Sequence, residues 1–596
     1  MKENLKKHRI LTGVAASSGI AVGRALFINR ASGGSFSTEI IHPKHFVREE
    51  KRLERAVADQ ACEFENAETK VRGMSQEQSD LLEAYSMICR DPKLMELARK
   101  AIRQDRLPAG LAWEKAVRSV LKSFEKIDVP YLRERAEDVK SVGSRVAARL
   151  RGRKAEPSPA LGCRVIMAHD LTPADTLALA PENILALATE MGGQTSHTGI
   201  LARGQRLPCV VGVTGLEEAA RDGAMVIVDG IRGLVIVNPM PDELAAYQKK
   251  QELLNLFEAR LRQEAHLPAK TEDGCRVRVY GNIETTNDAL RIRDLGGEGI
   301  GLYRTEFGYL SRLDLPTEEE LYADYTRIVR GMAPDRVVLR TLDIGADKSL
   351  AGIPKLEESN PVLGLRSIRL SLYCPDLLRS QCRAILRAAT HGNAALMFPM
   401  VSGLRELRQA KGIIEEARRE LLERGEPCAE NLPVGVMIEL PSSVFLAPAL
   451  AKEADFFSIG SNDLIQYILG VDRENKYVSY LYQPLHSAVL EAVRQVVEAA
   501  RQAGIRVSVC GEMASDPFCL PLLMAMGIDE FSVTPQAIPI LKYLIRRLNM
   551  PELRKLLAQV YDKVSTETTR RLMEKYMNGR FSQELQFINL GAKEDA

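Results

Sequence analysis

The amino-acid sequence predicts a multidomain α/β protein, in which a small α/β domain with an inserted α-helical bundle is followed by a (β/α)8 barrel. The 596 residues correspond to roughly three or four domains of ordinary size. A glycine-poor helical stretch fills residues 36–150, and short apolar strands alternate with helices through the second half of the chain. With 45% hydrophobic residues, the chain can bury large cores.

The N-terminal quarter combines predicted strands with a helical bundle. Residues 11–30 alternate glycine with small and β-branched residues and predict a pair of strands. The apolar stripe of a long first helix consists of Phe46, Leu53, Val57, Phe64 and Val71. A second helical run, Leu81 to Ile102, is interrupted at Asp91-Pro92, because proline opens a helix but disrupts its interior. Two more runs, Leu111 to Ile127 and Tyr131 to Leu150, complete the bundle.

A compact α/β domain is expected between Gly162 and Pro239, where short strands alternate with tight turns. The expected strands are Val165–Ala168, Ile184–Ala188, Cys209–Gly212, Met225–Val228 and Leu234–Val237. A basic, proline-containing linker, residues 151–159, precedes this domain, and a polar helix from about Pro241 to Ala265 follows it.

The second half of the chain predicts a barrel. Its apolar strands are expected at Val277–Tyr280, Gly299–Tyr303, Val337–Arg340, Leu396–Met400, Val434–Glu439, Phe456–Gly460, Val507–Cys510 and Phe531–Val533. Repeated strand–helix alternation of this count favours a (β/α)8 barrel over an open doubly wound sheet. The connection between the third and fourth strands is too long for one helix and must hold an insertion.

These patterns set the expected domain boundaries. They are 1–35 for N-terminal strands that pack on the small α/β domain, 36–150 for the bundle, 151–240 for the α/β domain, 241–265 for a linker helix, 266–550 for the barrel and 551–596 for C-terminal helices and a tail.

Charge and composition exclude several classes of function. The net charge of +2 gives no electrostatic basis for binding nucleic acid, which usually requires a clearly basic face. The sequence has neither a signal-peptide pattern nor an apolar run long enough to span a bilayer. The ten cysteines form no Cys-x-x-Cys pair and no cluster at zinc spacing, which is typical of reduced thiols. We therefore expect a cytoplasmic protein without membrane insertion.

Residues 191–203 are the most informative stretch, because His197 stands there just before a helix-like run. The two glycines that precede it permit a sharp turn, and Thr195 and Ser196 can cap the first turn of the helix. An imidazole at this position lies near free backbone N–H groups and the positive end of the helix dipole, which suits a phosphate group. A lone histidine is more often an ordinary capping or surface residue, so the interpretation depends on matching chemistry elsewhere.

That chemistry gathers at the ends of the predicted barrel strands, where the active sites of such barrels lie. The residues at or near these ends are Arg304, Arg340, Lys348, Arg366, Glu439, Asn462, Asp463, Arg473 and Cys510. Arginines offer forked donors to oxyanions, and Glu439 and Asp463 are suitable ligands for Mg²⁺. The set predicts a site for phosphoryl transfer. Cys510, taken alone, is more typical of a buried inert thiol.

Together these motifs resemble Enzyme I of the bacterial phosphotransferase system, the phosphoenolpyruvate–protein phosphotransferases, over nearly the whole chain. The segments that carry the resemblance are the GGxTSH-type block at His197, Asp170–Pro173, Gly299–Phe307, Arg340–Lys348, Ile438–Pro441, Phe456–Tyr467 and Val509–Met513.

The resemblance implies a role for each candidate residue. His197 would accept the phosphoryl group, oriented by Thr176, and Cys510 would protonate the enolate to give pyruvate. The residues implied to hold phosphoenolpyruvate are Arg304, Arg340, Lys348, Arg366, Asn462, Asp463 and Arg473. Glu439 and Asp463 would bind Mg²⁺. The small domain would be a swivelling phosphohistidine domain, the bundle would dock the phosphocarrier HPr, and the C-terminal domain would form a homodimer.

Several positions depart from the usual pattern of that family. Gln194 stands where an arginine is common, Tyr85 where a histidine is common, and Ser141 where an aspartate is common. The smaller departures are Ser18, Ala174, Ala346 and Ser461. None of these removes a catalytic group, and the changes in the bundle bear on which HPr is recognised.

Two alternative functions are considered. A dikinase or synthase would also use a phosphohistidine, but it needs a nucleotide-binding domain with a glycine-rich phosphate loop, and residues 36–150 are helical and glycine-poor. A non-catalytic regulator that senses phosphoenolpyruvate would be expected to lose at least one catalytic group, whereas His197, Glu439 and Cys510 are all present.

Overall fold

The computed structural model describes residues 8–28, 40–70, 84–124, 130–151, 164–171, 183–193, 196–205, 207–310, 314–345, 358–473, 475, 477–563 and 565–588. Two compact units can be distinguished, one running to Asn255 and the other covering Leu256–Leu585. The division falls inside a long helix, α9 (Pro241–Glu264), which covers the segment predicted as a linker helix.

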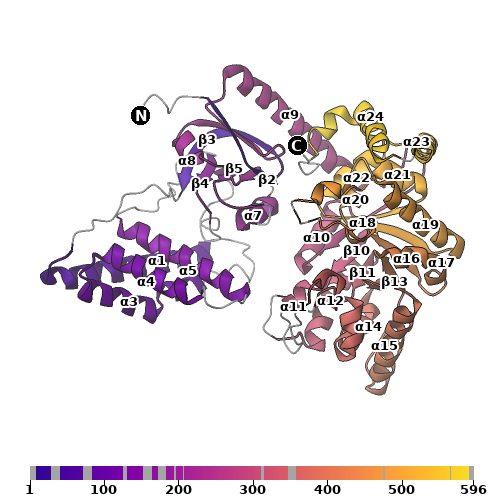
Figure 1. Ribbon diagram of the computed structural model, residues 1–596, viewed down its shortest axis with the longest axis horizontal. Helices are drawn as coiled ribbons and strands as arrows, with labels where there is room; N and C mark the ends of the chain where they lie inside the picture. The colour runs from indigo at the N-terminus through magenta and orange to yellow at the C-terminus, as the bar shows by residue number, and fades with distance from the viewer. Residues whose placement is uncertain are drawn as a thin grey trace. The chain divides into compact units, whose positions relative to one another are not determined.

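The helical bundle of the N-terminal unit forms as the apolar spacing predicts. Its helices, which lie alongside one another in Figure 1, include α1 (Phe46–Lys70), α3 (Pro92–Gln104), α4 (Ala109–Phe124) and α5 (Pro130–Leu150). Of the predicted stripe, Leu53, Val57 and Phe64 are buried, and Phe46 packs against the same core. Val71 lies outside the described residues. The indole Nε1 of Trp113 donates to the carbonyl of Gly143 at 2.9 Å, which joins α4 to α5.

The predicted interruption of the second helical run is confirmed. Pro92 begins α3, and Asp91 is its N-cap residue. One carboxylate oxygen of Asp91 accepts hydrogen bonds from the backbone N–H groups of Lys93 at 2.7 Å and Leu94 at 3.1 Å. These bonds satisfy donors that the helix itself leaves unpaired, so the start of α3 is fixed at the proline.

The second part of the N-terminal unit is an eight-stranded sheet with the strand order β1-β8-β7-β3-β4-β5-β6-β2. Its strands are β1 (Arg9–Thr12), β2 (Val14–Ser17), β3 (Ile20–Ile28), β4 (Arg164–Ala168), β5 (Ile184–Thr189), β6 (Cys209–Val211), β7 (Met225–Asp229) and β8 (Leu234–Val237). The strands predicted between residues 162 and 239 therefore all appear. The linker predicted at 151–159 falls almost wholly outside the described residues.

The prediction of a strand pair at residues 11–30 is wrong. The segment forms β1, β2 and β3, and these strands do not pair with one another. β3 pairs with β4 on one side and with β7 on the other, so neither of its edges remains for β2. β2 pairs instead with β6, and β1 with β8, which puts two consecutive short strands at opposite ends of the strand order.

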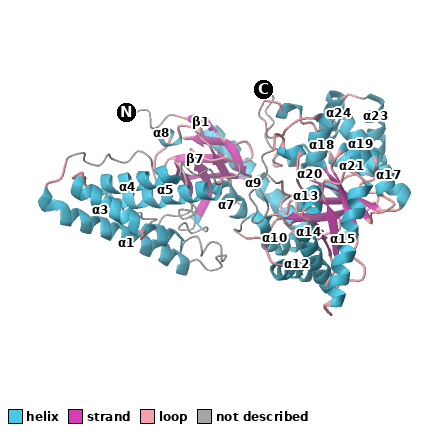
Figure 2. Ribbon diagram, turned by 60° about the horizontal axis from the view of Figure 1, so that its bottom comes forward, coloured by secondary structure: helices cyan, strands magenta, loops and turns pink. Residues whose placement is uncertain are grey.

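The C-terminal unit contains the predicted barrel, a closed ring of parallel strands in chain order. The strands are β9 (Arg278–Ile283), β10 (Gly299–Arg304), β11 (Arg336–Arg340), β12 (Ala394–Phe398), β13 (Val434–Ile438), β14 (Phe456–Gly460), β15 (Arg506–Cys510) and β16 (Glu530–Val533). Each overlaps a predicted strand, and the fold class predicted from the sequence is confirmed. Figure 2 shows these strands in the interior of the unit, with helices around them.

Helices cover the outside of the barrel strands. They are α10 (Thr286–Asp294), α11 (Phe307–Leu310), α12 (Glu318–Met332), α13 (Ile368–Tyr373), α14 (Pro375–Ala388), α15 (Leu404–Glu423), α16 (Pro441–Phe445), α17 (Ala447–Leu450), α18 (Ser461–Leu469), α19 (Ser487–Ala503), α20 (Glu512–Ser515), α21 (Leu520–Met526) and α22 (Ala537–Ile545), followed by α23 (Met550–Lys563) and α24 (Thr566–Leu585). Two of them, α13 and α14, lie in the long connection that was predicted to hold an insertion. Within the described ranges, we find no helix with both the length and the apolar character that crossing a bilayer demands.

The cap of α3 provides a test of the bundle. Asp91→Ala should lower the free energy of unfolding of the bundle by about 1 kcal/mol, because two N–H groups at the start of the helix lose their acceptor. Asp91→Asn, the matched control, keeps an acceptor oxygen and should lose much less. Chemical denaturation followed by the fluorescence of Trp113, the one tryptophan of the sequence, reports on this unit. Equal losses in the two variants would contradict a capping role.

Candidate functional site

His197 is the first residue of α7 (His197–Gln205), as the sequence predicts. Gly192 has a φ of +106°, a conformation that side-chain-bearing residues rarely adopt, so this glycine permits the turn before the helix. The hydroxyl of Ser196 accepts a hydrogen bond from the backbone N–H of Gly199 at 3.3 Å and thus caps the first turn. Gln194, Thr195, Thr176 and the side chain of His197 lie outside what the structure describes.

A histidine and a glutamate that were not singled out in the sequence hold the loop before His197. Glu190 follows β5, and its carboxylate contacts Nδ1 of His169 at 2.7 Å. The other oxygen of Glu190 accepts from the backbone N–H of Glu217 at 2.9 Å. Because the N–H of Met191 also donates to the carbonyl of His169, the start of the glycine turn is tied to the end of β4.

Arg340 is a buried charged residue at the carboxyl ends of the barrel strands. It ends β11 and is only 7% exposed. One terminal nitrogen contacts Asp343 at 2.7 Å and the other donates to Glu306. Its Nε has no hydrogen-bond partner among the described residues. The guanidinium is thus held in place by two carboxylates, with one donor left over.

Asp343 links Arg340 to a second arginine. Its other oxygen contacts Arg366 at 3.2 Å and accepts from the hydroxyl of Ser367. Burial opposes ionisation, but Arg340 and Arg366 hold the pKa of Asp343 at about 2. Ser367 has a φ of +55°, an unfavourable conformation for this residue, which the buried contacts around it maintain.

Arg304 and Arg366 complete the set of arginines with donors to spare. Arg304 ends β10, and its guanidinium contacts Glu284 at 3.0 Å. In the described part of the chain, Nε of both Arg304 and Arg366 is buried without a partner. Buried N–H groups that lack acceptors cost free energy, so these donors favour an oxyanion between them.

Glu439 is a buried acidic residue at the same ends of the barrel strands. It follows β13, is 1% exposed, and one oxygen accepts from the backbone N–H of Met400. Its Oε2 has no partner among the described residues. Burial raises the pKa of Glu439 well above its usual range, and the negative charges of Asp463 and Asp343 raise it further. Gly460 is required beside it, because a Cβ there would lie 2.6 Å from Oε2.

Cys510 ends β15 at the same edge of the barrel and is 2% exposed. Burial raises the pKa of its thiol, which therefore stays protonated near neutral pH. The hydroxyl of Ser458, in β14, donates to Sγ at 3.3 Å and opposes this shift. The charges of Glu439 and Arg340 also act on the thiol, so Cys510 belongs to the same cluster.

The remaining predicted residues lie around this cluster or outside the described ranges. The side chain of Asn462 accepts from the backbone N–H of Glu512 at 2.8 Å and so ties α18 to the loop after β15. Burial raises the pKa of Tyr482, and the charges of Glu512 and Asp463 raise it further. The exposed Arg473 lowers the pKa of Tyr482, so Arg473 stands near this hydroxyl. Lys348 lies outside the described residues.

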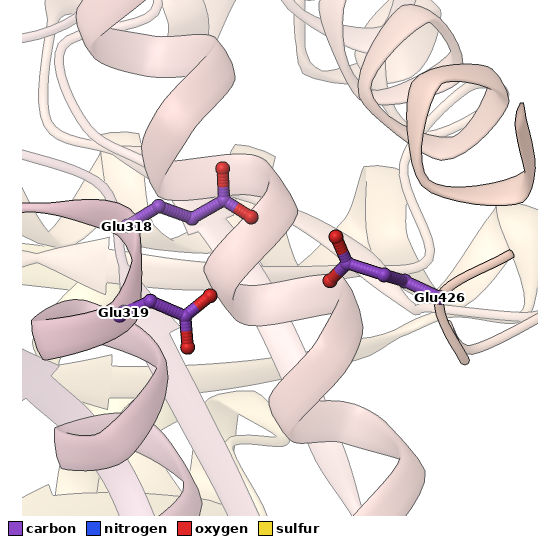
Figure 3. A group of neighbouring side chains, drawn as sticks. All are labelled: Glu318, Glu319 and Glu426. Atoms are coloured by element: carbon purple, nitrogen blue, oxygen red, sulfur yellow. The ribbon is translucent and has the colours of Figure 1, made fainter. Parts of the chain in front are cut away.

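A second group of carboxylates is drawn in Figure 3 and consists of Glu318 and Glu319 from α12 and Glu426 from the loop after α15. One guanidinium, that of Arg387, contacts Glu318 at 3.1 Å, Glu319 at 2.6 Å and Glu426 at 3.0 Å. Arg383 adds a contact to Glu318 at 2.6 Å. The group is thus an ion-pair network with its own cations, and the candidate metal ligands remain Glu439 and Asp463.

A closed (β/α)8 barrel with unpaired arginine donors and a buried thiol at its strand ends has the features of an enzyme that acts on a negatively charged substrate. Three families match the chain: "PEP-utilising enzyme, N-terminal" over residues 12–135, "PEP-utilising enzyme, mobile domain" over 162–233, and "PEP-utilising enzyme, PEP-binding domain" over 258–550. These matches follow the division into bundle, sheet and barrel that the structure displays.

Curated relatives of similar length agree with these matches. The phosphoenolpyruvate-protein phosphotransferase of Geobacillus stearothermophilus is 40% identical over 537 residues, which cover 90% of this chain and 92% of the relative. The enzyme of that name from Priestia megaterium is 39% identical over 559 residues, 94% of this chain and 97% of the relative. The chain therefore belongs to the family of phosphoenolpyruvate-protein phosphotransferases. The resemblance to Enzyme I and the enzyme class predicted from the sequence are confirmed.

The contact between Ser458 and Cys510 can be tested directly. Ser458→Ala removes the donor that stabilises the thiolate, so alkylation of Cys510 by iodoacetamide at a fixed pH should slow by about tenfold, the effect of losing one hydrogen bond to a charged group. Mass spectrometry of the Cys510 peptide gives the rate. Ser508→Ala is the matched control, because Ser508 donates to the carbonyl of Phe457 and not to the thiol. An unchanged rate in Ser458→Ala would show that Ser458 has no effect on the thiolate.

Proposed function

We propose that this chain transfers the phosphoryl group of phosphoenolpyruvate to His197, releases pyruvate, and passes the phosphoryl group to an HPr-type phosphocarrier protein. This is the first step of the sugar phosphotransferase system or of a related regulatory phosphorelay. The observation that carries the proposal is the cluster at the carboxyl ends of the barrel strands, where Arg304, Arg340 and Arg366 have buried N–H donors without partners and Cys510 stands beside them.

The arginines account for substrate binding. Phosphoenolpyruvate carries a phosphoryl group and a carboxylate, and both accept forked hydrogen bonds from guanidinium groups. Because Glu306 and Asp343 fix the buried guanidinium of Arg340, little reorganisation is needed when an oxyanion binds. We assign Arg304, Arg340 and Arg366 to substrate binding, with Asn462, Asp463, Arg473 and Lys348 as further contacts.

The chemical step requires a neutral imidazole and a proton donor. A ring nitrogen of His197 attacks the phosphorus atom, the bond between phosphorus and the bridging oxygen breaks, and the enolate of pyruvate leaves. The thiol of Cys510 then donates its proton to the methylene carbon of the enolate, which gives pyruvate and a thiolate. Burial keeps that thiol protonated, as a general acid must be, and Ser458 stabilises the thiolate that remains. Thr176 is assigned to orient the imidazole.

Mg²⁺ is the proposed cofactor. The residues fit it, since Glu439 has a buried oxygen without a partner in the described structure and the charges of Asp463 and Asp343 act on the same carboxylate. Glu439 and Asp463 would hold the ion, which supplies positive charge next to the transferring phosphoryl group.

The proposed partner surface is the helical bundle. Tyr85, which departs from the usual family pattern, is 1% exposed, and its hydroxyl donates to Asp138 at 3.0 Å, so it belongs to the bundle core and not to a docking face. The side chain of Ser141 lies outside the described residues. We further propose a homodimer through the C-terminal domain and a cytoplasmic location, which the free cysteines of the described structure support.

Labelling with radioactive phosphoenolpyruvate and Mg²⁺, without HPr, tests the central step. The wild type should acquire an acid-labile, base-stable label, and His197→Ala should acquire none, because the accepting nitrogen is absent. His391→Ala is the matched control, since this histidine contacts Tyr322 in the C-terminal unit and should not be the acceptor.

Two outcomes of this experiment would count against the proposal. Label that persists in His197→Ala, or disappears in His391→Ala, would move the acceptor to another residue. Bound phosphoenolpyruvate without any label in the wild type would favour the regulator that the sequence leaves as an alternative.

The raised pKa of Glu439 predicts a dependence of stability on pH. Without a divalent cation, folded Glu439 binds its proton more tightly than the unfolded chain does, so its contribution to the free energy of unfolding falls as the pH rises above 4.5. Glu439→Gln should remove this loss. Mg²⁺ at 100 times its dissociation constant should stabilise the wild type by about 2.7 kcal/mol and the variant by much less.

Thermal and chemical unfolding at several pH values, with and without Mg²⁺, measure both effects. Glu512→Gln is the matched control, because its carboxylate is not among the proposed ligands. Equal stabilisation of the wild type and Glu439→Gln by Mg²⁺ would assign the ion to another site.

A further inference from the structure

The amino-terminal ends of the same barrel strands surround a second polar cavity. Arg278 begins β9, Arg336 begins β11 and Arg506 begins β15, and all three line a cavity of about 970 Å³. Because the strands are parallel, this cavity opens at the end of the barrel opposite to Arg304, Arg340 and Cys510. At about 3.3 Å per residue, the five residues of β15 separate Arg506 from Cys510 by about 13 Å along the strand. We call this cavity the amino-end cavity.

Three guanidinium groups share one carboxylate in the amino-end cavity. Glu530, the first residue of β16, is 2% exposed and contacts Arg506 at 2.8 Å, Arg278 at 3.3 Å and Arg336 at 3.4 Å. The guanidinium of Arg336 also stacks on the ring of Phe456, 4.2 Å from its centroid, which fixes its orientation. One carboxylate offsets one of the three positive charges, so the arrangement repels itself unless further negative charge is present.

The other charges around the cavity do not remove this excess. Arg276 contacts Glu298 at 2.9 Å, and Arg293 contacts Asp335 at 3.1 Å, so these pairs are balanced. The cationic lining residues are Arg276, Arg278, Arg293, Arg336, Arg506 and Lys542, and the acidic ones are Asp294, Glu298 and Asp335. With Glu530 added, six positive groups face four negative ones. Burial and Glu530 raise the pKa of Asp529, and the nearby Arg506 lowers it. Counting Asp529 as a fifth negative group leaves an excess of one positive group.

Lys542 supplies a fixed donor group at the wall of the cavity. It lies in α22 and is 1% exposed, and its Nζ donates to the carbonyls of Ala265 and Gly296, both at 2.6 Å. Burial lowers its pKa to about 8. An anion in the cavity would favour the charged form of this lysine, so binding and protonation would support each other.

We propose that the amino-end cavity binds a small dianion of the phosphate-monoester or dicarboxylate class, between Arg278, Arg336 and Arg506. Both ligand types match the forked donors of guanidinium groups, and the volume of the cavity suits a molecule of metabolite size. This site is separate from the phosphoenolpyruvate site and would bind its ligand whether or not His197 is phosphorylated.

Calorimetric titration of the full chain with inorganic phosphate at pH 8 tests the proposal. We expect two binding events per chain. Arg304→Gln should weaken one of them, and Arg506→Gln should weaken the other by about tenfold, because a charge-assisted hydrogen bond is lost. Arg408→Gln is the matched control: its side chain is 64% exposed and it pairs with Glu453 on the outer helices. Titration with succinate separates the two ligand types, and binding of either one at the Arg506-dependent site supports the proposal.

A second variant keeps the test decisive if Arg506→Gln fails to fold. Glu530→Gln removes the carboxylate that the three guanidinium groups share, so its melting temperature in chloride should fall, and phosphate at equal ionic strength should raise it more than in the wild type. Glu453→Gln, which removes the half-buried partner of Arg408, controls for general salt effects. A single binding event that does not respond to Arg506→Gln or Arg278→Gln, or equal phosphate stabilisation of Glu530→Gln and the wild type, would overturn the proposal.

Discussion

The burial of the Arg340 charge is the constraint on which the barrel site depends. A guanidinium removed from water must have compensating partners, and removing one partner of such a buried pair typically costs about 3–5 kcal/mol. Arg340 has Glu306 from the loop after its neighbouring strand and Asp343 from its own loop. Because Asp343 also holds Arg366, the requirement to neutralise one charge positions two of the arginines that we assign to substrate binding.

The same constraint connects the site to the insertion between β11 and β12. The hydroxyl of Thr305 donates to the carbonyl of Arg340 at 2.8 Å, and the side-chain amide of Gln381, in α14, donates to Thr305 Oγ1 at 3.0 Å. The oxygen of that amide accepts from the N–H of Leu342 at 3.1 Å. A buried polar network is stable only if its members are satisfied. Gln381 therefore fixes the ends of two strands and one helix together, and the Nε atoms of Arg304, Arg340 and Arg366 are among the buried groups that stay without a partner in the described structure.

The sequence predicted the framework of this site better than its internal contacts. Apolar runs indicated the barrel strands, and the position of Arg304, Glu439 and Cys510 at strand ends followed from the common direction of parallel strands. The contacts of Gln381 with Thr305 and of Ser458 with Cys510 join residues 76 and 52 positions apart, and neither shows any periodic or motif signal. They depend on helix placement and on the register of neighbouring strands, which composition and spacing do not specify.

The N-terminal strands illustrate the complementary limit. Small and β-branched residues around Gly13 indicated strands correctly, but strand pairing depends on which edges remain free. β3 is bonded on both sides by strands that come much later in the chain, β4 and β7. A local reading favours a hairpin because only Ser18 and Gly19 separate β2 from β3. Long-range pairing overrides that preference. β3 forms one ladder of hydrogen bonds with β4 and another with β7, and a hairpin with β2 would take one of these two edges.

Burial acts on Glu439 and Cys510 in the same direction, and the consequences differ. It favours the protonated thiol of Cys510, which is the form that can deliver a proton to a carbanion. It also favours the protonated form of Glu439, which is the wrong form for a metal ligand. In the mechanism that we propose, Glu439 would therefore release its proton when a divalent cation binds, while Cys510 would keep its proton until the enolate forms. A positive charge close to Glu439 and Asp463 reverses the repulsion that raises the pKa of Glu439. Glu439 and Cys510 lie in the same buried cluster. The order in which they would lose their protons thus follows from where the cation and the substrate would bind.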